Sequence, residues 1–228
     1  MQPLLLLHGA IGSKDQLVSL HTELSKGFTV YSLDFAGHGS STVNANEFSI
    51  PLFAQQVLDL MDASQLERIS IAGYSMGGYV AMYLALHHPA RIEKIITLAT
   101  KYNWDETIAA KEIKMLDAQR IEEKLPAFAA ELNKRHGAND WKIVLEKTKT
   151  LLTGLGQHNW LSPEALGKIQ TPVLLLSGDK DKMVPAEETL AVYRLLPSAQ
   201  LGILPNTPHP IEQVNTKTLA FAIRQFMN

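Results

Sequence analysis

Short apolar segments alternate with longer segments of helical periodicity along this chain of 228 residues. The apolar segments are continuous Leu, Ile and Val runs, which is typical of strands covered on both faces of a sheet. The predicted strands are Pro3–His8, Phe28–Asp34, Arg68–Tyr74, Glu93–Ala99, Pro172–Ser177 and Gln200–Leu204. The predicted helices are Lys14–Ser25, Pro51–Met61, Met76–His88, Ala186–Leu196 and Thr216–Met227. This alternation predicts an α/β fold with a doubly wound, mostly parallel sheet of about six strands.

The alternation breaks between Tyr102 and about Lys168, where no strand pattern appears and charged residues become more frequent. Helical stripes and capping residues predict three helices and a final short turn there, over residues 109–125, 127–136, 139–152 and 162–164. We therefore expect residues 1–100 and 169–228 to form one α/β core. Residues 101–168 would be a helical cap inserted between two strands of its sheet.

Composition narrows the class of protein. The chain carries 21 basic and 23 acidic residues and no basic run, which argues against a nucleic-acid partner. It has no cysteine, and therefore no disulfide framework and no thiolate nucleophile. The N-terminal apolar run Leu4–Leu7 is too short for a signal segment, and no stretch reaches the ~18 apolar residues of a membrane span. We expect a cytoplasmic globular protein, whose oligomeric state the sequence does not specify.

The segment Gly73-Tyr74-Ser75-Met76-Gly77 joins a predicted strand to a predicted helix. A strand that reverses into a helix within one or two residues forces the serine between them into a strained backbone conformation. Small residues on either side let strand and helix approach each other. The Ser75 hydroxyl would then stand at the carboxyl edge of the sheet, where open α/β sheets bind their ligands. We therefore predict that Ser75 is a nucleophile rather than an inert polar residue of the turn.

A serine nucleophile needs a base, and the base needs a group that orients it. His209 lies in the loop after the last predicted strand, and both Asp179 and Asp181 follow the preceding strand. Parallel strands place these loops at the same edge of the sheet as Ser75, and the chain order Ser, Asp, His is the order of hydrolases with this turn. We predict His209 as the base and one of the two aspartates as its partner.

Catalysis by such a serine also needs N–H donors for the developing oxyanion. Gly9 follows the first predicted strand and lets the backbone turn, so the amides of Ala10 and Met76 are the predicted oxyanion hole. We expect His8 to make structural hydrogen bonds beneath this turn. The histidines have no metal-ligand spacing with a carboxylate, so we predict no metal site.

Several motifs together carry a resemblance to a known family. They are His8-Gly9-Ala10, Asp34-Phe35-Ala36-Gly37-His38-Gly39-Ser40-Ser41, Gly73 to Gly78, Pro172 to Pro185, and His209. With them the sequence resembles the α/β-hydrolase fold family, in its single-domain form with a helical cap. Family members place the catalytic acid three residues after the glycine that closes the strand and before a Val-Pro pair. The resemblance therefore implies Asp181 rather than Asp179. Family members usually carry an antiparallel pair of strands before the first parallel one, and this sequence leaves no room for that pair before Pro3, so we expect about six strands rather than eight.

The resemblance implies a serine hydrolase that acts on a small carboxylic ester or thioester and needs no cofactor. Two other readings stay open. A lyase or carbon–carbon bond hydrolase, such as the menaquinone-pathway synthase or the meta-cleavage product hydrolases, uses the same triad. The synthase typically has an arginine where this chain has Tyr79, and the carbon–carbon hydrolases have an asparagine where it has Tyr74. A ligand receptor with slow turnover is the second alternative.

All three tryptophans, Trp104, Trp141 and Trp160, fall in the predicted cap. Large side chains there would either bury the core of a small helical unit or roof an acyl pocket above Ser75. The basic residues of the cap are balanced by acidic ones, which is typical of a solvated face. Arg120, Lys134 and Arg135 nevertheless stay open as contacts for an anionic substrate.

Overall fold

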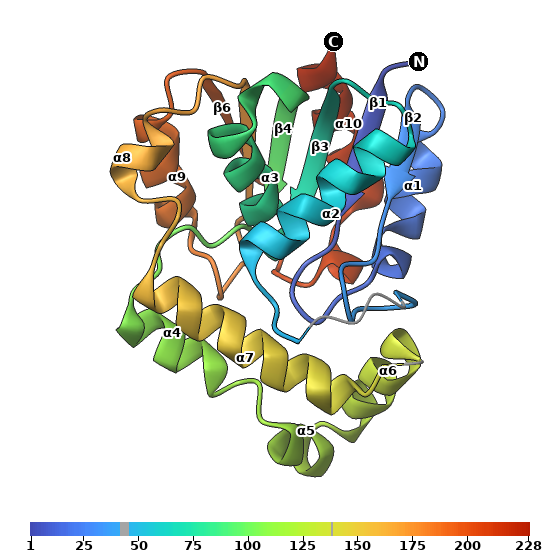
Figure 1. The fold of residues 1–228 in the computed structure, drawn as a ribbon, viewed down its shortest axis with the longest axis vertical. Coiled ribbons are helices and arrows are strands. Elements are labelled where there is room, and N and C mark those ends of the chain that lie inside the picture. Colours follow the sequence, from blue (N-terminus) through green and yellow to red (C-terminus); the bar gives the residue numbers. More distant parts are fainter. Residues whose placement is uncertain (42–45, 138) are drawn as a thin grey trace.

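The computed structural model describes residues 1–41, 46–137 and 139–228. Within these residues, six strands form one sheet in the order β2-β1-β3-β4-β5-β6, and every neighbouring pair is parallel (Figure 1). The strands are β1 (Pro3–Leu7), β2 (Thr29–Ser32), β3 (Ile69–Tyr74), β4 (Ile92–Leu98), β5 (Val173–Gly178) and β6 (Ala199–Leu204). The predicted parallel sheet of about six strands is confirmed.

Helices cover both faces of the sheet. One face packs against α1 (Val18–Leu24) and α10 (Thr216–Met227), and the other against α2 (Ile50–Ala63), α3 (Met76–His87) and α9 (Ala186–Leu195). The short 3-10 helices are η1 (Lys14–Leu17), η2 (Pro89–Arg91) and η3 (Ile211–Gln213).

The leucine run of β1 shows why these strands are continuously apolar. Leu4 and Leu6 lie in the hydrophobic cluster on the α1 and α10 face, whereas Leu5 and Leu7 lie in the cluster on the α2 and α3 face. All four side chains are fully buried. Successive side chains of a strand point to opposite faces, so a strand covered on both sides needs an apolar residue at every position.

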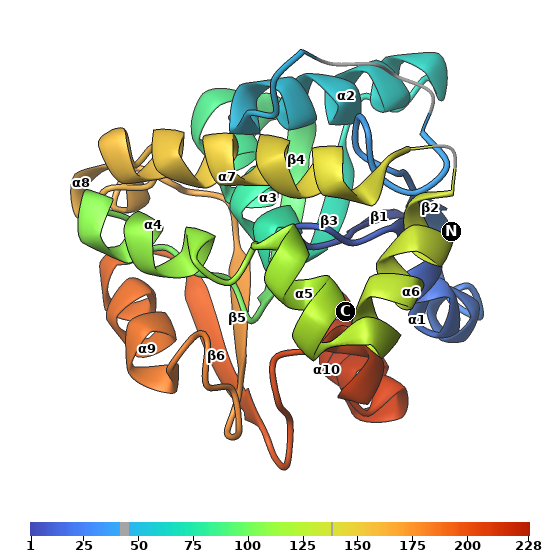
Figure 2. The ribbon, with the colours of Figure 1, turned by 90° about the horizontal axis from the view of Figure 1, so that it is seen from below.

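Among the described residues between β4 and β5, the chain forms five helices: α4 (Glu106–Ile113), α5 (Ala118–Lys124), α6 (Pro126–His136), α7 (Trp141–Gln157) and α8 (Pro163–Leu166). Figures 1 and 2 show α4 to α7 lying across the carboxyl ends of the strands. We call α4 to α7 the inserted helices. They have a small hydrophobic cluster of their own, formed by Ile121, Leu132, Trp141 and Leu145.

The predicted helix over residues 109–125 was wrong, because the chain forms α4 and α5 there. Asp117 ends the apolar stripe by accepting a hydrogen bond from the Arg120 backbone N–H, which makes it the N-cap of a new helix. The predicted N-cap at Asn139 was also wrong, since Asp140 caps α7. That helix continues through Gly154 and Gly156 to Gln157, because the packing of its buried face outweighs the low helix propensity of these two glycines. No helix among the described residues has the length and apolarity needed to cross a membrane.

Candidate active site

Ser75 lies in a strained turn between β3 and α3. Its backbone has φ 52° and ψ −118°, a region that residues other than glycine rarely adopt. The backbone N–H of Ser75 donates to the Leu98 carbonyl at 2.8 Å, which ties the turn to the end of β4. A Cβ at Gly77 would lie 2.5 Å from the Leu7 carbonyl oxygen, so only glycine lets α3 approach β1 this closely.

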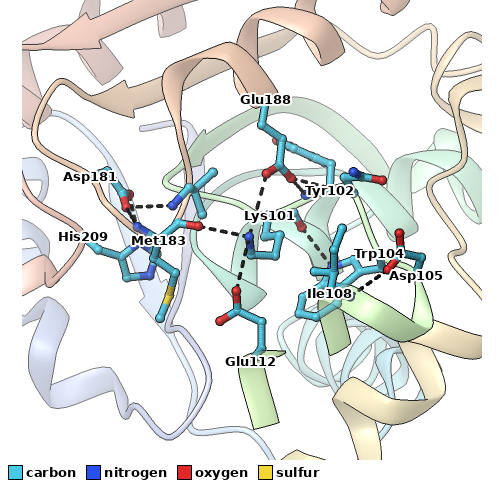
Figure 3. Close-up of polar contacts among 12 residues, drawn as sticks. Lys101, Tyr102, Trp104, Asp105, Ile108, Glu112, Asp181, Met183, Glu188 and His209 are labelled. Carbon is cyan, nitrogen blue, oxygen red and sulfur yellow. Dashed lines mark hydrogen bonds and ion pairs between the residues drawn. The ribbon is translucent and has the colours of Figure 1, made fainter. Parts of the chain in front are cut away.

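His209 and Asp181 form a hydrogen-bonded pair at the same edge of the sheet. His209 Nδ1 donates to Asp181 Oδ2 at 2.8 Å, and this leaves Nε2 unprotonated in the neutral ring (Figure 3). Asp181 Oδ1 accepts the backbone N–H groups of Met183 and Val184, both at 2.8 Å. Burial by itself raises the pKa of Asp181, but the hydrogen bonds from His209 and the two amides outweigh it and hold the pKa below its usual value.

Asp179 has a different partner. Its Oδ1 accepts the backbone N–H of Thr207 at 2.9 Å, two residues before His209 in the chain. The backbone N–H groups of Thr207 and Asn206 lower the pKa of Asp179. The structure therefore brings Asp181 to the imidazole and gives Asp179 to the backbone of the histidine loop.

Ser75 and His209 line one cavity of about 470 Å³, together with both predicted oxyanion residues, Ala10 and Met76. Gly9 allows this convergence, because a Cβ there would lie 2.9 Å from Cε1 of Tyr74 and 3.2 Å from the Ser75 Cβ. The loops after β3, β5 and β6, which carry Ser75, Asp181 and His209, all follow parallel strands of one sheet and lie at the same edge of it, as the sequence predicted.

Most of the cavity wall is apolar. Residues 101–168 contribute Trp104, Met115, Leu116, Phe128, Leu151, Leu152 and Leu155, and the core contributes Ala10, Ile11, Ile50, Tyr74, Met76, Tyr79, Met183, Val184 and Pro210. Trp104 is the tryptophan that lines the cavity. Trp141 is buried in the small cluster of the inserted helices, and Trp160 packs against Tyr83 and His158.

The charged side chains in the wall are engaged with one another. Lys101 Nζ donates to the Met183 carbonyl at 3.0 Å and lies 3.4 Å from Glu112 of α4 and 3.9 Å from Glu188 of α9 (Figure 3). It thereby joins the Asp181 loop to α4. Sequence reasoning missed Lys101, since a single lysine after a strand carries no motif.

Arg135 also lines the cavity and is similarly paired. Its Nη2 lies 2.5 Å from Glu131 and 3.2 Å from Glu212, and 9% of its side chain is exposed. Neither Arg120 nor Lys134 is among the residues that line the cavity. An anionic substrate would have to compete with the carboxylates that hold Arg135.

Comparison with known proteins identifies the family to which this fold belongs. The family model described as the alpha/beta hydrolase fold matches residues 2–138. The chain belongs to the α/β-hydrolase fold family. The esterase YbfF of Escherichia coli K12 is 26% identical over 243 residues, covering 99% of this chain and 93% of the esterase. A thermophilic esterase from Thermogutta terrifontis is 25% identical and superposes with a TM-score of 0.81, covering 100% of this chain and 89% of that one.

An uncharacterized Mycobacterium tuberculosis protein matches a shorter region of this α/β-hydrolase. It is 32% identical over 96 residues, which cover 42% of this chain and only 28% of the mycobacterial protein.

Three fully buried histidines, His8, His38 and His136, gather beside the site of this α/β-hydrolase. The Phe35 N–H donates to His8 Nε2 at 3.1 Å, so His8 Nδ1 carries the hydrogen and donates to the Gly9 carbonyl. The structural hydrogen bonds expected of His8 are thus present. Burial lowers the pKa of His8 and of His136 to about 4, and that of His38 well below its usual value.

Acid should therefore destabilise the fold in a defined window. Above about pH 6.5 these histidines are neutral in both the folded and the unfolded chain. As the pH falls toward 4, only the unfolded chain binds their protons, so stability is lost at about 1.4 kcal/mol per pH unit for each histidine. We expect urea denaturation to show this steep loss between pH 6.5 and 4.5. In His136→Gln the side chain cannot bind a proton. The free energy of unfolding should therefore fall less steeply with pH, by the contribution of about one proton. An unchanged slope would contradict this account.

Proposed function

We propose that this protein is a serine hydrolase that cleaves a small carboxylic ester or thioester through Ser75, His209 and Asp181. The observation that carries the proposal is the pairing of His209 Nδ1 with Asp181 beside a serine in a strained strand-to-helix turn, with both opening on one cavity. The esterase relatives support the same class of reaction.

The mechanism follows from the hydrogen bond between His209 Nδ1 and Asp181, which leaves Nε2 of His209 as a proton acceptor. The unprotonated Nε2 of His209 accepts the Ser75 hydroxyl proton while Oγ attacks the substrate carbonyl carbon. Asp181 keeps Nδ1–H in place and stabilises the imidazolium that forms. The imidazolium then gives its proton to the leaving alcohol or thiol, and His209 activates water to hydrolyse the acyl-enzyme.

The oxyanion needs donors that are in place before the reaction. The Met76 N–H lies at the N-terminus of α3, where helical N–H groups have no partner within the helix. Ala10 follows Gly9 in the turn that faces Ser75. We propose the backbone amides of Ala10 and Met76 as the two donors. No cofactor enters this mechanism.

Residues 101–168 supply part of the substrate wall. We propose that residues 1–100 and 169–228 form the catalytic core and residues 101–168 a cap over it, because seven apolar side chains between Trp104 and Leu155 line the cavity that Ser75 also lines. The cytoplasmic location and the absence of a nucleic-acid partner stay predictions from the composition.

Covalent labelling tests the proposal directly. A fluorophosphonate probe should label the protein stoichiometrically, and mass spectrometry of peptides should place the adduct on Ser75. The probe's fluoride leaves as Ser75 Oγ bonds to phosphorus, the reaction that the triad activates. An adduct on another residue, or none, would end the proposal.

The apolar wall predicts the acyl preference. Uncharged short to medium acyl chains should give a higher kcat/KM than dicarboxylate half-esters, because the cationic Arg135 and Lys101 are already neutralised by carboxylates. Burying each additional CH₂ adds about 0.8 kcal/mol, so kcat/KM should rise roughly 3- to 4-fold per methylene until the cavity is filled. A panel of p-nitrophenyl esters from acetate to octanoate, with succinate half-ester alongside, measures this. Preference for the half-ester would contradict it.

A lyase or carbon–carbon bond hydrolase built on the same triad is the alternative. The Tyr79 hydroxyl is committed to structure, since it donates to Asn159 Oδ1 at 2.7 Å and accepts the Leu161 N–H at 3.2 Å. It therefore does not replace the arginine that the synthase has at this position.

Measurable ester turnover separates the hydrolase from a ligand receptor, for which saturable binding without turnover is expected.

A further inference from the structure

We propose that Arg135 and His136, at the end of α6, are positioning residues that hold the oxyanion turn, residues 9–11, in its catalytic geometry. The inference rests on the proposed function. It makes the inserted helices part of the catalytic apparatus as well as a wall for the substrate.

The turn is strained at Ile11, the residue after Ala10. Ile11 has φ 51°, a conformation that β-branched residues avoid because their Cβ substituents clash with the backbone. A residue stays in such a conformation only where its surroundings fix it. Ile11 must therefore be held by its neighbours in the folded chain.

Two donors from α6 converge on the Ile11 carbonyl oxygen. Arg135 Nη1 and His136 Nε2 each lie 3.1 Å from it. The tautomer of His136 is determined by its other nitrogen, because the Gly39 N–H donates to Nδ1 at 3.1 Å. Nε2 therefore carries the hydrogen and donates to Ile11.

The Ile11 side chain is held by the same part of the chain. It packs against the small cluster of the inserted helices, which contains Leu132 of α6 and Trp141 of α7. Figures 1 and 2 both show α6 beside the carboxyl ends of β1 and β2, where this turn lies. The inserted helices thus contact both the carbonyl and the side chain of Ile11, and the side chain also packs against the core cluster on the α2 and α3 face.

A second set of contacts connects Arg135 to the segment that follows His209. Arg135 pairs with Glu212, which follows His209 by three residues, and Glu212 Oε1 also accepts from Gln16 Nε2 at 2.6 Å. Gln16 Oε1 in turn accepts the Ser13 N–H at 3.0 Å. Arg135 therefore links the oxyanion turn and the segment after His209 to the same helix.

Kinetics on p-nitrophenyl acetate, whose acyl group is too short to use the apolar wall, test the inference. Arg135→Met and His136→Leu should lower kcat by about 10- to 100-fold with KM within about 2-fold, because a displaced donor stabilises the transition state less but binds the ground state equally. His136→Gln keeps a donor for Ile11 and an acceptor for Gly39, so it should recover kcat to within about 3-fold of the wild type.

A matched control separates positioning from general damage. Arg224 also donates to a backbone carbonyl, that of Glu23 at 2.6 Å, and pairs with a carboxylate, but between α10 and α1. Arg224→Met should change the melting temperature of the protein and leave kcat within about 2-fold of the wild-type value. An equal fall of kcat in Arg224→Met and Arg135→Met would overturn the inference.

The inhibition constant Ki of a trifluoromethyl ketone is a second measurement, and a loss of fold stability does not change it. Ser75 Oγ bonds to its carbonyl carbon, the hydroxyl proton passes to His209, and the negative charge goes to the carbonyl oxygen in the oxyanion hole. Its Ki should rise in Arg135→Met by the same factor as kcat falls, while the Ki of the matched methyl ketone stays constant. An unchanged Ki for the trifluoromethyl ketone, or an effect confined to KM, would overturn the inference.

A wild type without Ser75-dependent turnover would overturn the proposed function, and this inference with it.

Discussion

Ser75→Ala should lower kcat by about 10³-fold or more and abolish labelling by the fluorophosphonate probe. The substitution removes one oxygen atom at a position whose backbone, at φ 52°, is strained equally for serine and alanine. The fold should therefore be kept, and thermal melts of the two proteins should agree closely. The loss of turnover then reports the nucleophile alone.

Ser177→Ala is the matched control. Ser177 is fully buried in β5, and its hydroxyl has no hydrogen-bond partner within the part of the chain that the structure describes. Removing it should leave kcat and labelling at wild-type values. Persistent labelling in Ser75→Ala at the wild-type rate would exclude the serine hydrolase mechanism.

Asp181→Asn should cut kcat by roughly 10³- to 10⁴-fold, the loss that follows when a triad carboxylate becomes an amide. An amide N–H facing His209 Nδ1 cannot accept its hydrogen, which favours the wrong tautomer and removes the charge that stabilises the imidazolium. The two backbone N–H donors at Met183 and Val184 direct the amide oxygen toward themselves, and so its NH₂ toward His209.

Asp179→Asn is expected to behave very differently. Its side-chain oxygen can still accept the Thr207 N–H, so the histidine loop keeps its anchor and kcat should stay within about 3-fold of the wild type. Measured kcat values for both variants, with melts to verify folding, decide the assignment. A crippled Asp179→Asn beside a near-normal Asp181→Asn would move the triad acid by two residues.

Local patterns explain how much of the fold was predictable. The leucine run of β1 is apolar at every position because both faces of the sheet are covered, and this requirement is visible in the sequence. The inserted helices were less predictable. Their stripes are short, so one capping side chain, that of Asp117, was enough to split a predicted helix.

The predicted chemistry at Ser75, His209 and Asp181 follows from the chain itself, because the residues that shape each loop are its neighbours in sequence. Gly73 and Gly77 flank the serine, and Asp181 lies two to three residues from the amides that it binds. Parallel strands then bring the loops to one edge without further information. The local sequence thus determined the sheet, the strained turn and the candidates Ser75 and His209, whereas the choice of Asp181 over Asp179 came from the family resemblance.

The contacts between the inserted helices and the turn at Ile11 were decided only by the tertiary structure. Arg135 and His136 reach Ile11 across sequence separations of 124 and 125 residues, and Lys101 reaches Met183 across 82. Periodicity and capping act over a few residues, and they fix which face of a helix is apolar but not which distant carbonyl its last turn will meet. That choice depends on the packing of the inserted helices as a whole, which places their cluster against Ile11 and so brings the donors of α6 to its carbonyl.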